Sequence, residues 1–181
     1  MNGPRVLVAY ASRHGATREL AEALARDLMA SDAGRGLGLY AAAVPAESRP
    51  DPGHWDAVVL GSAVYAGRWL PAARDLATRC AGSLRRRPVW LFSSGPIGEP
   101  PYPVDEAQDA PAVAALLAPR GHRIFPGRID TALLGFAERA VVTAMRAPVG
   151  DFRDWDALRD WAGAIAAELA GTPVPEPAAH S

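Results

Sequence analysis

Two kinds of apolar pattern alternate along the chain. Short apolar runs rich in β-branched residues are typical of strands buried on both faces of a sheet, and they cover residues 5–10, 37–44, 57–61, 88–92 and 122–128. Between them apolar residues recur every three or four positions, as in amphipathic helices, over residues 17–30, 70–80, 113–118, 131–145 and 156–169. This alternation predicts right-handed crossovers and an α/β fold, a doubly wound five-stranded parallel sheet with helices on both faces.

The loops between these elements contain the candidate sites. Proline-rich or glycine-rich loops are expected over residues 45–54, 93–111 and 148–154, and an irregular loop over 62–69. In a doubly wound sheet ligands bind beyond the carboxyl ends of the strands, so the loops after the first, third and fourth strands are the ones to inspect. Residues 1–171 are expected to form a single domain, and residues 172–181, rich in proline and alanine, a flexible tail.

Composition narrows the class of protein. Of the 181 residues 49% are hydrophobic and 22% are charged, and the formal net charge is -1. These values are typical of a globular domain and predict no general attraction to nucleic acid or to anionic membranes. No apolar run approaches the roughly 20 residues that span a bilayer. The amino terminus enters the first strand without the features of a signal peptide, so we expect a cytoplasmic protein.

Two absences from the sequence restrict the chemistry. Cys80 is the single cysteine, which excludes disulfides within the chain, CxxC redox pairs and cysteine-ligated iron–sulfur clusters. All 19 cationic residues are arginine. Because a Walker-type phosphate loop and a Schiff-base enzyme both need lysine, both classes are excluded. The four histidines are scattered without metal-ligand spacing, so no metal site is predicted.

The loop after the first strand has the chemistry of a phosphate site. Residues 12–17 read Ser-Arg-His-Gly-Ala-Thr and lead directly into a helix. Gly15 allows a tight turn, and the hydroxyls of Ser12 and Thr17 flank it. The start of the helix presents free N–H groups and the positive end of the helix dipole. The alternative is a plain turn in which Thr17 caps the helix.

The loops after the third and fourth strands are suited to a flat ring. Between Gly61 and Trp69, glycines allow the backbone to approach a ring edge, and Tyr65 and Trp69 have the aromatic surface to stack on a ring. The alternative is that both aromatic side chains pack on the following helix. Residues 93–98 are small and rich in hydroxyl groups, which suits contact with a ring. The alternative is that they form an ordinary turn. Three such loops at the ends of strands favour one shared site.

The same segments resemble the flavodoxin superfamily. Residues 12–17 follow its phosphate-loop pattern Ser/Thr-x-Thr-Gly-x-Thr except at His14, and they fully match the Ser/Thr-Arg-x-Gly-x-Thr form of its menaquinone-dependent protoporphyrinogen oxidase branch. After the third strand that branch has the pattern Gly-Ala/Ser-Ser/Ala-Ile/Val-x-x-Gly, matched here by Gly61, Ser62, Ala63, Val64 and Gly67. The resemblance covers residues 5–169 and includes a helix inserted before the last helix.

This resemblance implies an FMN site. The phosphate would be bound by Ser12, Arg13, His14, Gly15, Ala16 and Thr17. The ring would be framed by Ser62, Ala63, Val64, Tyr65, Gly67, Ser93, Ser94, Gly95, Pro96 and Gly98. The implied activity is an FMN-dependent oxidoreductase that passes hydride or electrons between a reduced substrate and a quinone-like acceptor. The flavin would carry this chemistry, and no catalytic acid or base is identified among the side chains.

The inserted helix, residues 131–145, is apolar with interspersed charges at Glu138 and Arg139. In the oxidase branch it is thought to help with substrate or membrane access. Packing on the core or on another subunit, as in a homodimer, is favoured over contact with a quinone, a porphyrin or, peripherally, a membrane.

Two other functions are open at this point. A flavodoxin-type electron carrier between protein partners has the same fold, although carriers are usually strongly acidic and the net charge here is -1. A flavodoxin-fold binding module without cofactor is favoured by His14, which replaces a hydroxyl in the phosphate loop. A colourless preparation that ignores added FMN would exclude both flavin functions.

Overall fold

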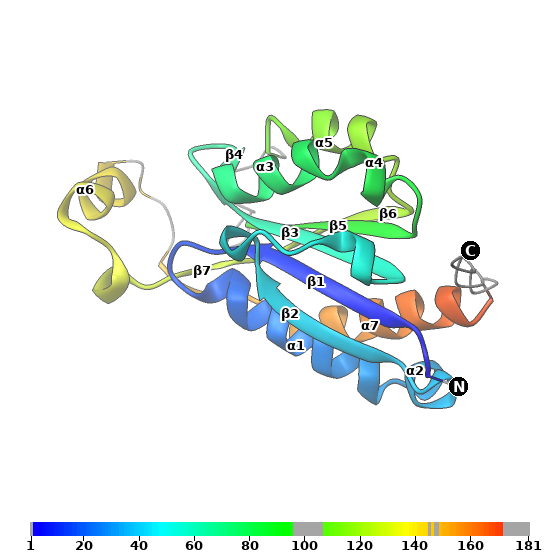
Figure 1. Ribbon diagram of the computed structural model, residues 1–181. Coiled ribbons are helices and arrows are strands. Elements are labelled where there is room, and N and C mark those ends of the chain that lie inside the picture. The colour runs from blue at the N-terminus through cyan, green and yellow to red at the C-terminus, as the bar shows by residue number, and fades with distance from the viewer. Residues whose placement is uncertain (1, 96–106, 145, 147–148, 172–181) are drawn as a thin grey trace.

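The computed structural model describes residues 2–95, 107–144, 146 and 149–171. Five parallel strands form one sheet in the order β2-β1-β3-β5-β6 (Figure 1). Their bounds are β1 Arg5–Ala11, β2 Tyr40–Pro45, β3 Ala57–Tyr65, β5 Val89–Ser94 and β6 Gly121–Phe125. The predicted doubly wound α/β fold is confirmed, with β1 at the switch point, flanked by β2 on one side and β3 on the other.

Helices cover both faces of this sheet (Figure 1). One layer consists of α1 Ala16–Ala30, α2 Asp32–Leu37 and α7 Trp155–Ala170. The other consists of α3 Pro71–Arg79, α4 Ala81–Leu84 and α5 Ala110–Leu117. Short 3-10 turns, Ala46–Ser48 and Pro52–His54, occupy the predicted loop 45–54. In the described ranges, none of the helices combines the length and apolar character that crossing a membrane requires.

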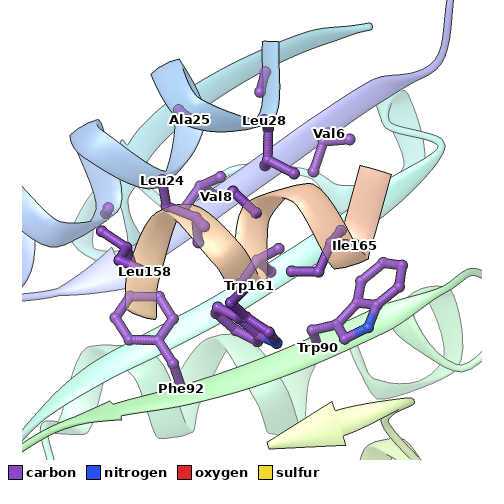
Figure 2. Close-up of a cluster of buried hydrophobic side chains, with 14 of the residues drawn as sticks. Val6, Val8, Leu24, Ala25, Leu28, Trp90, Phe92, Leu158, Trp161 and Ile165 are labelled. Atoms are coloured by element: carbon purple, nitrogen blue, oxygen red, sulfur yellow. The ribbon is translucent and has the colours of Figure 1, made fainter. Parts of the chain in front are cut away.

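Alternate residues of each strand point to opposite layers. In β1, Val6 and Val8 pack with the α1 and α7 layer, whereas Leu7 and Ala9 pack with the α3 and α5 layer. Figure 2 shows the first of these cores, in which Trp161 of α7 lies beside strand β5. Burial of each large apolar side chain contributes about 1.5–3 kcal/mol. These two cores fix the strands and therefore the loops at their carboxyl ends.

Two strands are shorter than predicted. The strand expected over 37–44 begins only at Tyr40, because residues 32–37 form helix α2. Gly38 caps the end of this helix with a φ of 63°. The sequence pattern did not predict this helix, because its two internal glycines, Gly34 and Gly36, have low helix propensity. The strand expected over 122–128 ends at Phe125, because Pro126 follows and lacks the N–H that a ladder requires.

The segment 62–69, expected to be irregular, is an ordered hairpin. Strand β3 continues to Tyr65, and β4 Arg68–Trp69 pairs with it in antiparallel fashion. The two turn residues, Ala66 and Gly67, have φ angles of 50° and 74°. Positive φ at both central positions is the geometry that connects twisted antiparallel strands through two residues. Tyr65 therefore lies in the hairpin, past the last register pair of β3 with β5, which is Ala63 with Ser94.

The insert before the last helix is joined to the fold by a small ladder. Strand β7 Arg128–Ile129 pairs with β8 Gly150–Asp151 in antiparallel fashion, so both ends of the insert leave the domain at one point. Between them lie the 3-10 turn Thr131–Leu133 and helix α6 Phe136–Ala144. Figure 1 shows α6 far from both helical layers, beyond the end of β1.

Candidate functional site

Residues 12–17 at the end of β1, here called the phosphate loop after their sequence pattern, have the shape of an anion site. The Ser12 hydroxyl oxygen accepts a hydrogen bond from the Gly15 N–H at 3.1 Å, which closes the loop. Gly15 is the N-cap of α1 with a φ of 90°, a conformation that residues with a side chain rarely adopt. Within the described chain no side chain caps this end of α1, so its first N–H groups point into the loop. The alternative in which Thr17 caps the helix is wrong, because the helix begins before it.

Three loops from three strands line one cavity of about 590 Å³ at this edge of the sheet. Cofactor sites in proteins usually measure about 300–1,000 Å³. From the phosphate loop the cavity is lined by Ser12, Arg13, His14, Ala16 and Thr17. From the loops after β3 and β5 it is lined by Ala63, Val64, Tyr65, Ala66, Gly67, Ser94 and Gly95. Of the other predicted ring residues, Pro96 and Gly98 lie outside the described residues.

Ser62 and Ser93 use their hydroxyl groups inside the protein rather than in the cavity wall. The Ser62 oxygen accepts the Leu70 N–H at 2.9 Å, and the Ser93 oxygen accepts the Trp69 Nε1–H at 2.9 Å. The two serines are register partners in β3 and β5, and strand alternation turns both toward the α3 and α5 layer. Contact of either residue with a ring through its backbone stays a prediction.

The two aromatic residues of the hairpin differ in burial. Trp69 is buried at 1% exposure and packs with the core beneath α3 and α5. Tyr65 is 39% exposed and lines the cavity. The Arg13 guanidinium lies 4.0 Å from the centre of the Tyr65 ring, a cation–π contact that joins the phosphate loop to the hairpin. Among the described residues, Tyr65 is therefore the tyrosine or tryptophan that lines the cavity.

Helix α6 contributes a carboxylate to the phosphate loop. The Glu138 Oε1 atom lies 2.6 Å from Arg13 Nε, and its Oε2 atom lies 3.2 Å from His14 Nε2. Glu138 also accepts the Gly135 N–H at 3.0 Å. That hydrogen bond, followed by the charges of His14 and Arg13, holds the pKa of Glu138 below its usual value. Sequence reasoning missed the contact of Glu138 with the phosphate loop. Only the hydrogen bond with Gly135 has a local signal, because a Glu three residues after a helix N-cap is a known capping position.

The insert covers the cavity instead of joining the core. Every residue of α6, all of which the structure describes, is exposed or half-buried, and Phe136 is 91% exposed. Four apolar side chains of the insert line the same cavity as the phosphate loop: Leu133, Leu134, Val141 and Val142. Packing of this helix on the core, one of the two expected arrangements, is therefore wrong, and packing on another subunit stays a prediction.

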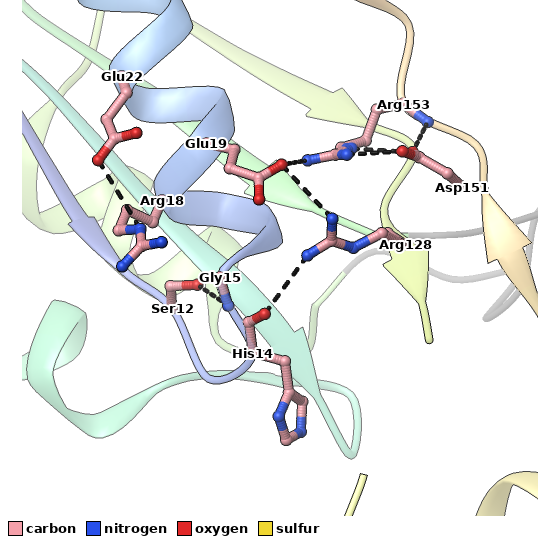
Figure 3. Close-up of polar contacts among 9 residues, drawn as sticks. All are labelled: Ser12, His14, Gly15, Arg18, Glu19, Glu22, Arg128, Asp151 and Arg153. Atoms are coloured by element: carbon pink, nitrogen blue, oxygen red, sulfur yellow. Dashed lines mark hydrogen bonds and ion pairs between the residues drawn. The ribbon is translucent and has the colours of Figure 1, made fainter. Parts of the chain in front are cut away.

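Four charged residues anchor the base of the insert to α1 (Figure 3). The Arg153 side chain, only 5% exposed, donates to Asp151 Oδ1 at 2.8 Å and to Asp151 Oδ2 at 2.6 Å, and also to Glu19. Arg128 lies 3.5 Å from Glu19 Oε2 and donates to the His14 carbonyl at 3.5 Å. Hydrogen bonds from Arg153 are the main reason that the pKa values of Glu19 and Asp151 are lowered.

The comparison with protein families agrees with this geometry. The family described as "Flavodoxin domain" matches residues 7–156, from β1 through the insert to the start of α7. The chain belongs to the flavodoxin domain family. Proteins with a flavodoxin domain normally bind a flavin, and the cavity described above lies where the family's fold binds ligands. No curated protein matches the chain at the level of sequence.

Solved structures share the flavodoxin fold at low sequence identity. Rubredoxin:oxygen oxidoreductase from Desulfovibrio gigas has a TM-score of 0.59 and 14% identity over 92% of this chain and 36% of its own. The Flv1 flavodiiron core from Synechocystis sp. PCC6803 has a TM-score of 0.63 and 15% identity over 94% of this chain and 37% of its own. A flavodoxin from the domain Archaea has a TM-score of 0.59 and 14% identity over 91% of this chain and 98% of its own. The chain thus spans little more than a third of the first two proteins.

Proposed function

We propose that this flavodoxin domain is an FMN-dependent oxidoreductase that passes hydride or electrons between a reduced substrate and a quinone-like acceptor. The observation that carries the proposal is the cavity itself, in which the loops after β1, β3 and β5 meet at the carboxyl edge of the sheet. The cavity has a helix N-terminus at one end and an aromatic hairpin at the other.

The phosphate end of the cavity fits a phosphomonoester. The first N–H groups of α1 and the hydroxyls of Ser12 and Thr17 are donors, and the dipole of a 15-residue helix favours an anion there. Gly15 allows the backbone to turn without a side chain in the way. Ser12, Arg13, His14, Gly15, Ala16 and Thr17 would hold the phosphate, as expected from the sequence.

The other end fits a flat ring. Gly67 and Gly95 have φ angles of 74° and 112°, so the backbones of both loops can approach a ring edge closely. The Gly95 N–H donates to the Phe125 carbonyl at 2.9 Å, which fixes the start of this loop against β6. Tyr65, Val64 and Ser94 would complete the frame. Bound FMN would supply hydride and single-electron transfer.

The wall provided by the insert favours an apolar acceptor. Leu134, Val141 and Val142 of the insert line the same cavity as the phosphate loop, and an apolar lining with few polar groups is typical of sites for small organic molecules. The matching patterns at residues 12–17 and 61–67 support a protoporphyrinogen oxidase-like enzyme. A quinone is the acceptor that this lining suits best.

Two measurements test the proposal. The first is a titration of purified protein with FMN, followed by absorption and by flavin fluorescence; we expect stoichiometric binding. The second mixes the anaerobically reduced, flavin-loaded protein with menadione as electron acceptor, and the oxidised, flavin-loaded protein with protoporphyrinogen as electron donor. We expect turnover with at least one of them, and a protein that binds no FMN, or turns over neither compound, contradicts the enzyme.

An electron carrier is the second candidate. The flavodoxin from Archaea is covered over 98% of its length, so no large part of a small carrier is missing from this fold. Against a carrier, the insert covers the cavity edge through which a protein partner would approach a flavin. FMN binding without turnover of a quinone, but with oxidation by a redox protein, would favour the carrier.

A further inference from the structure

Arg128 lies beside the phosphate loop, although 114 positions separate it from His14 in the sequence. It is in the two-residue strand β7, and its partner strand β8 fixes its backbone. A Cβ atom built on Gly15 would lie 4.0 Å from Arg128 Nη2, and that same nitrogen reaches the His14 carbonyl at 3.5 Å. Arg128 also lines the cavity. Its guanidinium is therefore at the turn where an anion would meet α1.

The neighbouring charges leave this guanidinium able to take another acceptor. Glu19 is held mainly by Arg153, which also binds Asp151 with two hydrogen bonds of normal length. The contacts of Arg128, by contrast, are long: 3.5 Å to Glu19 and 3.5 Å to His14. A guanidinium has five N–H donors. The side chain is 21% exposed, so it is partly shielded from water while facing the cavity.

The arginine of the loop itself, Arg13, is already paired with a carboxylate. Arg13 and His14 both contact Glu138, at 2.6 Å and 3.2 Å. A phosphomonoester carries between one and two negative charges near neutral pH, which is more than the half charge of a helix terminus balances. Arg128 lines the same cavity and reaches the His14 carbonyl, so it can supply the remaining charge.

We propose that Arg128 is a ligand of the cofactor's phosphoryl group and makes the site select phosphorylated flavin over riboflavin. This inference rests on the proposed function, because it assigns a residue to the phosphate of the same FMN site. Arg128 would donate to a phosphoryl oxygen with the nitrogen that now reaches His14. Glu19 and the β7–β8 ladder act as its support, holding the guanidinium in place before the anion arrives.

The test compares two flavins and four proteins. Dissociation constants of FMN and riboflavin are measured by fluorescence titration for the unaltered chain, R128Q, R128K and R123Q. Arg123 is an exposed residue of β6 outside the cavity wall, so R123Q removes the same charge elsewhere. We expect R128Q to weaken FMN binding by about tenfold and to leave riboflavin binding unchanged, since a hydrogen bond between charged groups is lost. R128K should retain most of the affinity, and R123Q all of it.

Other outcomes overturn the inference in separable ways. Equal losses for FMN and riboflavin in R128Q would mean a structural role, and unchanged FMN affinity would mean no contact with the phosphate. In both cases FMN still binds the unaltered chain, so the proposed function stands. If the unaltered chain binds neither flavin, the proposed function fails and this assignment with it. Melting temperatures of all four proteins show whether each variant is folded.

Discussion

Glu138 of α6 and Arg13 of the phosphate loop form an ion pair with 2.6 Å between Oε1 and Nε, across a sequence distance that spans most of the domain. The same carboxylate contacts His14. Helix α6 has little other attachment to the fold, because every residue of it is exposed or half-buried. The ion pair therefore helps to keep α6 over the cavity, while the β7–β8 ladder and the Arg153 network hold the base of the insert.

Removal of the Glu138 charge should loosen the insert. In E138Q we expect hydrogen exchange of the amides in residues 136–144 to become a few times faster, since a partly exposed ion pair contributes modestly and no core contact replaces it. Exchange in α1 should not change. Glu22 pairs with Arg18 on the exposed side of α1, so E22Q is the charge-matched control. Unchanged exchange of α6 in E138Q would show that the apolar wall alone holds the insert.

The buried Arg153 should make stability depend on pH in the acid range. The pKa values of Glu19 and Asp151 are lowered from their ordinary values of 4.5 and 3.8, mainly by hydrogen bonds from Arg153. A carboxyl group with a lowered pKa in the folded state contributes stability above its unfolded pKa, and this contribution is lost as the pH falls through the folded pKa. The network should therefore weaken progressively below about pH 5.

Urea denaturation of R153Q at pH 7 and at pH 3.5 measures this dependence. We expect a loss of about 2 kcal/mol in the free energy of unfolding at pH 7, discounted from the usual cost of breaking a buried ion pair because Glu19 and Asp151 are partly exposed. The loss should be clearly smaller at pH 3.5. R159Q removes an exposed arginine that pairs with Asp156 and should change little at either pH. An equal loss at both pH values would assign the effect of R153Q to packing alone.

The strands and the principal helices could be predicted from the sequence, because burial of one helix face requires apolar residues every three or four positions and burial of a strand requires a short apolar run. The predicted helix 17–30 differs from α1 by one residue at its start, and the predicted helix 156–169 differs from α7 by one residue at each end. The cavity could be predicted from topology, since loops after parallel strands must meet at one edge. The hairpin after β3 was missed because Ala66, which is not a usual turn residue, takes a positive φ.

Contacts between distant residues could not be predicted in the same way. Arg128 meets Glu19 across 109 positions, and no local pattern encodes such a meeting. Ser62 and Ser93 were assigned to the ring because the sequence of a hydroxyl-bearing loop does not tell which of its hydroxyl groups face the cavity and which face the interior. The register of β3 on β5, with Ser62 opposite Ser93, decides that both side chains face the interior.

Two glycines offer opposite tests of the core. A Cβ on Gly61 would lie 2.1 Å from the Phe92 ring, whereas a Cβ on Gly163 of α7 meets nothing within 4 Å. G61A should therefore lower the free energy of unfolding by about 1–3 kcal/mol through overpacking. G163A should raise it by about 0.5–1 kcal/mol, because alanine favours the helix. Thermal unfolding of both variants decides; a G61A protein as stable as the unaltered chain would mean that Phe92 moves aside without cost.

The hydrogen bond between Trp69 and Ser93 should be measurable as a coupling energy. Trp69 Nε1 donates to the Ser93 oxygen at 2.9 Å, and both residues are buried at 1% exposure. S93A leaves the indole N–H without this acceptor and should cost about 1–3 kcal/mol. W69F removes the donor as well as ring volume, so the double variant should lose less than the sum of the two single variants, by about 1 kcal/mol.

A double-mutant cycle from urea denaturation gives this coupling directly. His122 lies 3.0 Å from the same Ser93 oxygen, so a third variant, H122A, determines whether the serine proton serves the imidazole as well. Because the hydrogen bond ties the β3–β4 hairpin to β5, its loss should also increase hydrogen exchange at Tyr65 and Gly67. Additive effects of S93A and W69F, with unchanged exchange in the hairpin, would mean that the core alone fixes Trp69 and that the hydroxyl contributes nothing to the cavity's shape.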